Sequence, residues 1–299
     1  MSYDGAGSLF ALGMRVTKLN PDGSPMVGDR TSYVTDSLIQ AQLGLEYEDG
    51  DEIVQKNGSG VICLTYKAPD SLKRGTISAL QVCTPDPNIL SFMTGGRVLQ
   101  RGDREVGYGA PEVGSDPNPD GFSLEMWTRA VIDGAYAGYF WWVVPRANVR
   151  PTDSWTLSGS DPLVPEFEGS STQNPNWLDG PNNDWEFPSD RVWQFVETST
   201  LPDLTPGFHP VLAQPTVASL AVTPPTNPLA VDGTVQLIAT ATLTPTGTKD
   251  VTLASNWVSS DPTIATVNSA GFVTALTVGT ATITATYGTA TDDATVTVS

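Results

Sequence analysis

The residues in this sequence that could do acid–base or nucleophilic chemistry are few, and their positions do not favour catalysis. His209 is the only histidine, and it stands between Phe208 and Pro210 in a proline-rich stretch. A histidine base needs a third group to orient it and a nucleophile to face, and no partner is evident at such a position. No Cys and His pair has zinc-ligand spacing, and neither a Gly-x-x-x-x-Gly-Lys-Ser/Thr nor a Gly-x-Gly-x-x-Gly loop occurs. We therefore expect a protein that is not an enzyme and that has no cofactor and no metal.

One short segment resembles half of a calcium-binding loop. Asp116, Asn118 and Asp120 precede Gly121 in the order Asp-x-Asn-x-Asp-Gly, which is the first half of an EF-hand loop. The twelfth position holds Trp127 instead of a bidentate Glu, and two prolines fall inside the loop. We interpret the segment as a plain turn.

Carboxylates and tryptophans leave two further kinds of site open. A glycosidase needs only two acids at a suitable separation, and a sequence with 33 acids does not locate such a pair. Six tryptophans are either a platform for sugar rings or packing residues of the core and of subunit interfaces, and we favour packing. These are Trp141, Trp142, Trp155, Trp177, Trp185 and Trp193.

The composition indicates short strands joined by ordered turns. The chain has 299 residues, enough for two domains. Only 16% of the residues are charged, whereas Gly and Pro number 28 and 24, a mixture that suits strands and turns better than long helices. The net charge is −18, so the protein is not expected to grip nucleic acid through its phosphates. An acidic wall could still surround DNA without adsorbing it.

Signals for secretion, membranes and disulfides are weak. The N-terminus has no basic segment followed by an apolar one, so we expect synthesis in the cytoplasm. The longest apolar stretch, residues 135–145, is about half of the ~20 residues that span a bilayer, so no membrane insertion is expected. Cys63 and Cys83 flank a predicted hairpin, and both a bridge and two buried free thiols stay open.

The chain divides near residue 210, where tryptophans give way to alternating Thr, Val and Ala. We expect a first domain over residues 1–205, a proline-rich linker over 206–215, and a second domain over 216–299. In the first domain, residues 32–42, 60–67, 76–82, 122–132, 139–144 and 191–198 are expected as strands, with a turn at 69–75 and an irregular region at 151–188.

One helix is expected in the first domain. Thr84 or Asp86 can cap it, Pro87 suits its first turn, and Gly95 and Gly96 end it. Its apolar face is formed by Ile89, Leu90, Phe92 and Met93.

The last 85 or so residues alternate in a way that is typical of a β-sandwich with one buried tryptophan. Its expected core includes Trp257, Ile264, Val273 and Ile283. The runs Gly233-Thr-x-Gln-Leu237, Ile264-Ala-Thr-Val267 and Gly279-Thr-Ala-Thr-Ile-Thr-Ala285 resemble the bacterial immunoglobulin-like group 2 domain. That family often has Gly where this chain has Asp232. The resemblance implies a surface-exposed module of adhesins and phage virion proteins, without catalysis.

Three segments of the first domain carry a further resemblance: the helix segment 85–97, Ser123-Leu-Glu-Met-Trp-Thr-Arg129, and Tyr139-Phe-Trp-Trp-Val-Val-Pro-Arg146. They resemble the tail tube (major tail) proteins of long-tailed phages of actinobacteria. This resemblance implies a β-sandwich or barrel-forming domain with one flanking helix, assembled into hexameric rings that stack into a DNA-conducting tube. The implied partners are further copies of the chain and the tape measure, tail terminator and distal tail proteins. The implied location is the virion tail, assembled in the host cytoplasm.

Such a tube would present acids to the passing DNA. The candidates are Glu46, Glu48, Asp49, Asp51 and Glu52; the alternative is a solvated loop over residues 44–60 that touches the next ring. The favoured function is thus a tail tube subunit with an outward immunoglobulin-like decoration. A surface adhesin that binds host glycan, through the Trp-rich part or the C-terminal domain, and a polysaccharide-degrading tail enzyme are the alternatives.

Overall fold

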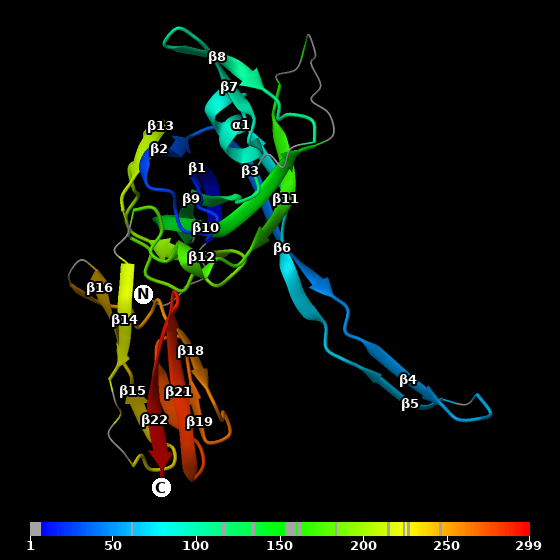
Figure 1. The fold of residues 1–299 in the computed structure, drawn as a ribbon, viewed down its shortest axis with the longest axis vertical. Helices are drawn as coiled ribbons and strands as arrows, with labels where there is room; N and C mark the ends of the chain where they lie inside the picture. Colours follow the sequence, from blue (N-terminus) through cyan, green and yellow to red (C-terminus); the bar gives the residue numbers. More distant parts are fainter. Residues whose placement is uncertain are drawn as a thin grey trace. The chain divides into compact units, whose positions relative to one another are not determined.

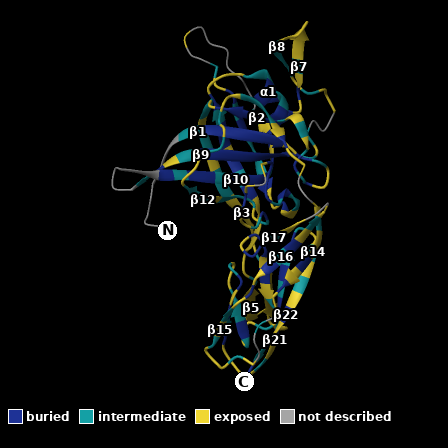
Figure 2. Cartoon of the chain, turned by 90° about the vertical axis from the view of Figure 1, so that its left-hand side faces the viewer, coloured by how far each residue is buried: buried dark blue, intermediate teal, exposed yellow. Residues whose placement is uncertain are grey.

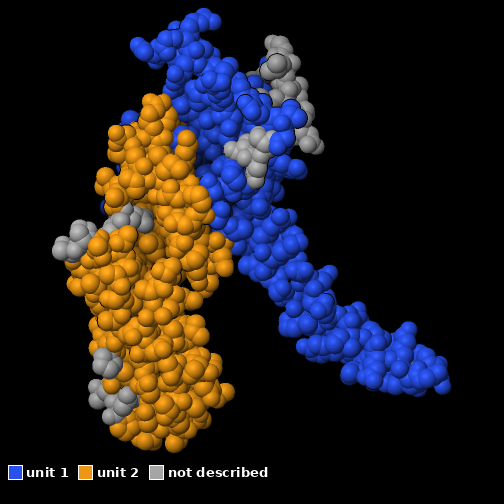
Figure 3. Space-filling model, in the orientation of Figure 1, with its two compact units in different colours: residues 1–16, 34–172, 192–207 blue, residues 17–33, 173–191, 208–299 orange. Residues whose placement is uncertain are grey.

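The described residues form 22 β-strands, one α-helix and one 3₁₀ turn, which confirms the mainly β fold expected from the sequence. The computed structural model describes residues 7–60, 62–114, 118–132, 135–152, 160, 163–182, 184–213, 216–223, 225, 228–244 and 247–299. The chain forms two compact units (Figure 3). Unit 1 comprises residues 1–16, 34–172 and 192–207, and unit 2 comprises residues 17–33, 173–191 and 208–299.

Unit 1 is built on one antiparallel sheet that carries two projecting hairpins. The sheet strands follow the order β1-β9-β10-β11-β6-β3, with β12 also paired to β10. The bounds are β1 Gly7–Lys18, β3 Leu38–Glu48, β4 Glu52–Lys56, β5 Ile62–Lys67, β6 Ser71–Val82, α1 Pro87–Thr94, β7 Arg97–Arg101, β8 Arg104–Gly109, β9 Phe122–Ile132, β10 Ala135–Pro151, β11 Glu166–Thr172 and β12 Gln194–Thr198.

The centre of this sheet is buried on both faces, as the dark strands β1, β9 and β10 show (Figure 2). Arg15 of β1 is placed there with Glu125 of β9; their side chains are 3% and 0% exposed and form two hydrogen bonds of 2.7 and 2.6 Å. Trp141 Nε1 donates to the same carboxylate at 3.2 Å. The Arg15 guanidinium lies 5.3 Å from the ring centre of Trp127. The charge is therefore hydrogen-bonded on several sides, as a buried ion requires.

Helix α1 follows its sequence signals closely. The Asp86 carboxylate accepts from the backbone N–H of Asn88 at 2.8 Å, Pro87 occupies the first turn, and Gly95 closes the helix with φ +68°. A left-handed closing residue is the conformation in which glycine has no Cβ penalty. The side chains of Ile89, Leu90, Phe92 and Met93 are buried.

Several local expectations for unit 1 are wrong. Residues 32–42 are not one strand, because a bend at 36–37 separates β2 (Gly28–Thr35) from β3. The expected turn at 69–75 is largely β6, and the irregular region at 151–188 contains β11. The strands β1, β7 and β8 were not expected. Cys63 and Cys83 form no disulfide, and both are exposed instead of buried.

Unit 2 combines an immunoglobulin-like sandwich with two earlier segments of the chain. Three small sheets have the orders β14-β16-β17, β15-β20-β19 and β18-β21-β22. The bounds are β13 Gly207–Val211, β14 Thr216–Val222, β15 Thr234–Gln236, β16 Ala239–Thr244, β17 Thr248–Asp250, β18 Asn256–Ser259, β19 Ala265–Val267, β20 Phe272–Ala275, β21 Gly279–Tyr287 and β22 Ala290–Val298, with the 3₁₀ turn η1 at Pro175–Trp177.

The sandwich core contains the residues that the alternation places inside. Val273 and Ile283 are fully buried, Trp257 is 8% exposed, and Ile264 is partly buried against them. The indole of Trp257 donates to the Thr252 carbonyl at 2.9 Å, which satisfies its one polar group.

The predicted linker at 206–215 contains a strand. β13 pairs with β2 at the end of the strand order, and an edge strand is where a proline such as Pro210 is found in a sheet. Phe208 is also anchored: its ring lies 5.0 Å from that of Tyr33, and the Arg30 guanidinium lies 3.8 Å from its centre. Residues 214–215 are outside the described part.

Replacing Arg15 alone should strongly destabilise unit 1. In Arg15→Met the Glu125 carboxylate stays buried without its cation, and breaking a buried pair costs about 3–5 kcal/mol. The double variant R15M/E125L should recover much of the loss, because no unpaired charge is left. Arg150→Ala, which removes an exposed ion pair with Glu168, should change stability by less than about 1 kcal/mol. Denaturant unfolding followed by Trp fluorescence checks all three.

Asp232 adopts φ +65°, which explains why glycine suits this position. The left-handed region costs an L-residue about 1–2 kcal/mol, and less for Asp. Asp232→Gly should therefore stabilise unit 2 by about 0.5–1 kcal/mol, and Asp232→Ala should destabilise it. Calorimetry of the three proteins measures the shift; an equal effect of both substitutions would contradict the assignment.

Candidate functional site

The most prominent surface feature is a long hairpin arm in unit 1, formed by the ends of β3 and β6 and by the paired strands β4 and β5 (Figure 1). β3 pairs with β6 down to Glu48 and Ser71, and Glu52 then pairs with Lys67. The two-stranded sheet β4–β5 has no further strand among the described residues. Both of its edges therefore present backbone groups that another strand could bind.

The arm exposes large apolar side chains. Every described residue from Asp51 to Lys67 is exposed, and Ile53 and Tyr66, which face each other across the strands, are 57% and 54% exposed. The other exposed apolar residues of the arm are Leu45, Tyr47, Val54, Ile62, Leu64 and Leu72. A surface with so many exposed apolar groups is typical of a contact site.

The acids predicted as lumen or inter-ring residues lie where β3 leads into the arm; we call this region, residues 46–52, the elbow. Glu46 is bound by Arg74 at 2.6 Å and by Lys73 at 3.2 Å, and these two cations lower the pKa of its carboxyl. Asp49 lies 3.5 Å from the Lys67 ammonium. Residues 44–60 are mostly strand, not loop, because β3 extends to Glu48 and β4 begins at Glu52.

The Lys67 ammonium neutralises part of the elbow and is shared between Asp49 and Asp70. Asp70 lies 3.2 Å from Lys67 and raises its pKa, with Asp49 adding to the effect. The pKa of the Asp70 carboxyl is lowered first by the Gly50 backbone N–H and then by Lys67. For Glu48, Asp51 and Glu52 the described part of the chain contains no ion pair.

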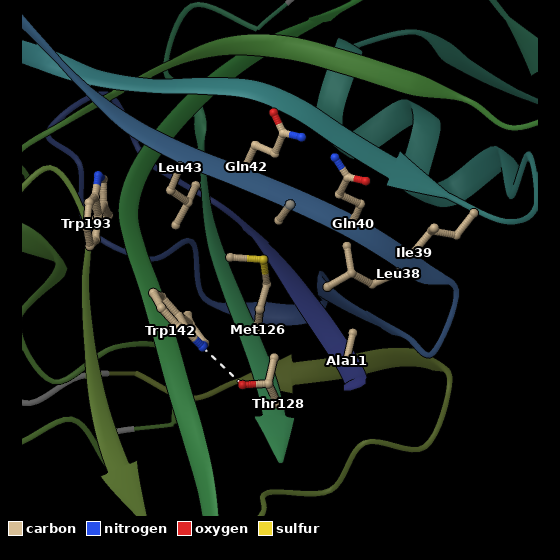
Figure 4. Close-up of a pocket in the computed structure, with 11 residues that line it drawn as sticks. Ala11, Leu38, Ile39, Gln40, Gln42, Leu43, Met126, Thr128, Trp142 and Trp193 are labelled. Carbon is tan, nitrogen blue, oxygen red and sulfur yellow. Dashed lines mark hydrogen bonds between the residues drawn. The ribbon is translucent and has the colours of Figure 1, made fainter. Parts of the chain in front are cut away.

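Unit 1 also holds an apolar pocket of about 590 Å³ between β3, β9 and β10 (Figure 4). Trp142 Nε1 donates to Thr128 Oγ1 at 3.1 Å at one side of the pocket, and Trp193 Nε1 donates to the Gly44 carbonyl at 3.0 Å. Its described lining residues include no Asp, Glu, Lys, Arg, Cys or His, so they offer no group for acid–base catalysis. The lining residues are Ala11, Leu38, Ile39, Gln40, Ala41, Gln42, Leu43, Met126, Thr128, Trp142 and Trp193.

The tryptophans divide between core and pocket. Trp141, Trp177 and Trp185 are 8%, 0% and 1% exposed, which favours packing over a sugar platform at those positions. Trp142 and Trp193 line the pocket. Trp155 lies outside the described residues.

Among the described residues no three His, Cys, Asp or Glu side chains lie so that they could hold one metal ion. In the calcium-like segment Asp116 is outside the described part, while the Asn118 carbonyl accepts from Gly121 N–H in a turn. Within the described ranges no helix is long and apolar enough to cross a bilayer.

Unit 2 contains a polar clasp that the sequence did not indicate. The buried carboxylate of Asp179 accepts from the Tyr287 hydroxyl at 2.7 Å and from Lys249 Nζ at 2.5 Å. Leu178 packs on the sandwich core. Segment 173–191 is thereby fastened to the immunoglobulin-like strands, which is why the compact units depart from the expected division at 206–215.

Comparison with known proteins identifies one part of the chain. Residues 216–298 match the bacterial Ig-like domain (group 2), which confirms the immunoglobulin-like assignment of the C-terminal domain. No curated protein matches the sequence.

Among solved structures, the surface layer protein SbsC (domains 1–6) is similar at 11% identity and a TM-score of 0.25, covering 89% of this chain and 52% of that one. The S-layer protein rSbsC(31–844) is similar at 13% identity and a TM-score of 0.24, with coverages of 92% and 40%. The chain thus spans about half or less of the length of these proteins.

Tyr287→Phe should weaken unit 2 in a pH-dependent way. Burial, and then the Asp179 charge, raise the pKa of Tyr287 well above its usual value of 10.0. A raised folded-state pKa contributes stability that is present below pH 10 and is lost as pH rises further. The variant should lose about 1–3 kcal/mol at pH 8 and show a flatter decline above pH 10. Thermal unfolding between pH 7 and 12 tests this; parallel curves for both proteins would contradict it.

Proposed function

We propose that this chain is a structural subunit that assembles with copies of itself, and that the assembly is a phage tail tube of stacked hexameric rings. The observation that carries the proposal is the arm of β4 and β5, with its exposed apolar side chains and two unpaired edges. Unpaired strand edges and exposed apolar side chains lead to non-specific association with other chains unless they are covered. In an assembly, the neighbouring subunit covers the arm and so prevents this association.

The other features support a structural role. The net charge of −18 suits a channel that passes DNA without binding it. We expect no catalysis from the immunoglobulin-like domain. We assign this domain to the outside of the tube, because a sandwich of this size would block the channel. On this proposal the protein is located in the virion, is not an enzyme, and contacts the tape measure, terminator and distal tail proteins.

A glycan-binding surface adhesin is the second candidate, and one feature of unit 2 favours it. A cavity of about 200 Å³ has Phe187, Asp190 and Asn256 among the residues that line it. An aromatic ring beside polar groups is a common way to hold a sugar. Pull-down on immobilised bacterial cell-wall glycan separates this function from assembly.

Removal of the arm should abolish assembly. The variant replaces residues 51–67 by Gly-Asn-Gly, which closes β3 and β6 with a short turn and removes the exposed apolar groups of β4 and β5. Size-exclusion chromatography with light scattering and negative-stain electron microscopy over a range of concentrations should show rings or tubes for the full chain and monomers for the variant.

The control variant keeps the arm and changes a residue of unit 2 instead. Asn256→Ala alters the small cavity of unit 2 and should assemble like the unchanged protein. Monomers of the unchanged protein at every concentration, also after addition of a tail initiator complex, would contradict the proposed function. Assembly of the arm-less variant would show that the arm is not its basis.

A further inference from the structure

A second hairpin of unit 1, β7–β8, carries an unneutralised group of arginines. Arg97, Arg101 and Arg104 are exposed, and none has an ion pair in the described part of the chain. Arg101 lies directly opposite Arg104 across the turn at Gly102, whose φ is +63°. Like charges opposite each other destabilise a hairpin. The acids of the same hairpin are Asp103 in the turn and Glu105, which accepts from Asn88 Nδ2 at 2.6 Å. An anion from outside the hairpin would relieve the remaining repulsion between Arg101 and Arg104.

The elbow of the arm carries the complementary charge. Its surroundings hold six acids, Glu46, Glu48, Asp49, Asp51, Glu52 and Asp70, against three bases, Lys67, Lys73 and Arg74. The bases contact Glu46, Asp49 and Asp70. The remaining acids, Glu48, Asp51 and Glu52, are all exposed.

The two charged regions belong to two different projections of unit 1. In Figures 1 and 3 the β7–β8 hairpin projects at one end of this unit, whereas the arm projects from the other. The hairpin of a chain therefore lies far from its own elbow and is free to meet the elbow of another copy.

We propose that the arginines of β7–β8 in one copy dock against the acidic elbow of the next copy. The occupant of each surface is thus a second copy of this chain, and the inference rests on the proposed function because it names the contact by which the subunits join. A contact between two different patches is heterologous, so it repeats from copy to copy and builds rings or filaments. Exposed apolar residues beside both patches, Leu99 and Val106 on the hairpin and Leu45 and Tyr47 near the elbow, are covered by the same contact.

Charge exchange tests the contact directly. R101E/R104E makes the hairpin acidic, and E48K/D51K makes the elbow basic; Glu52 is left unchanged because its cross-strand neighbour is Lys67. Each variant alone should raise the concentration needed for assembly about tenfold or more, since several ion pairs become repulsive contacts. The effect should fall when salt is raised, because exposed charges are screened.

A mixture of the two variants is the decisive sample. The acidic hairpin of one variant fits the basic elbow of the other, and the remaining unchanged hairpin and elbow fit as before. An equimolar mixture should therefore assemble at a concentration within about threefold of the unchanged protein, which also shows that both variants are folded. The control R129E/R150E changes the net charge by the same amount at two other exposed arginines and should assemble normally, because the ion pair that Arg150 gives up with Glu168 is itself exposed.

The outcomes separate the two proposals. No assembly of the unchanged protein under any condition removes the proposed function itself. Normal assembly of R101E/R104E, or failure of the mixture to assemble, overturns this contact while leaving self-assembly in place. Normal assembly of R101E/R104E with loss of binding to a 30-base single-stranded DNA would instead assign the arginines to a nucleic-acid ligand.

Discussion

The buried ion pair of Arg15 and Glu125 is the constraint on which unit 1 depends. Two charges held away from water are favourable only when their hydrogen bonds are complete. A shift of β1 along β9 by one residue would break both hydrogen bonds between Arg15 and Glu125, so the ion pair fixes the register of these two strands. Trp127 and Trp141, whose rings are stacked 5.9 Å apart, close the site against water. The strands β6 and β3, from which the arm extends, continue the same sheet beyond β10 and β11.

Some of the fold could be predicted from the sequence because its signals are local. Asp86, Pro87 and Gly95 mark helix α1 by their own backbone preferences. The alternation around Val273 and Ile283 likewise places the immunoglobulin-like core. Of the arm, β5 is predicted by the strand pattern of residues 60–67, whereas β4 falls in the segment 44–60, for which a loop is the alternative. β4 has no buried face, so a period of two gives no single hydrophobic side to detect.

The candidate contact surfaces were only partly predictable for a related reason. The acids of the elbow are evident in the sequence, but which of them is neutralised depends on the strand pairing. The pairing of β3 with β6 brings Lys73 and Arg74 to Glu46, and the pairing of β4 with β5 brings Lys67 to Asp49. The arginines of β7–β8 stand beside Asp103 and Glu105 in the chain, and only the hairpin register shows that Arg101 and Arg104 face each other. The pairing of the strands, and not the composition, decides which charged side chains are left without an ion pair and can contact another molecule.

The fastening of segment 173–191 has a consequence for how the protein is made. Asn174 and Asn176 bind the carbonyls of Gly23 and Asp22, about 150 residues earlier, and Asp179 binds Tyr287, 108 residues later. A chain leaving the ribosome carries the early partners long before the last one exists. The clasp can therefore form only after Tyr287 has been made, and a product that ends before Lys249 leaves the Asp179 carboxylate without its hydroxyl and its lysine. The closing of unit 2 thus waits for a residue made 108 positions after the segment that it holds.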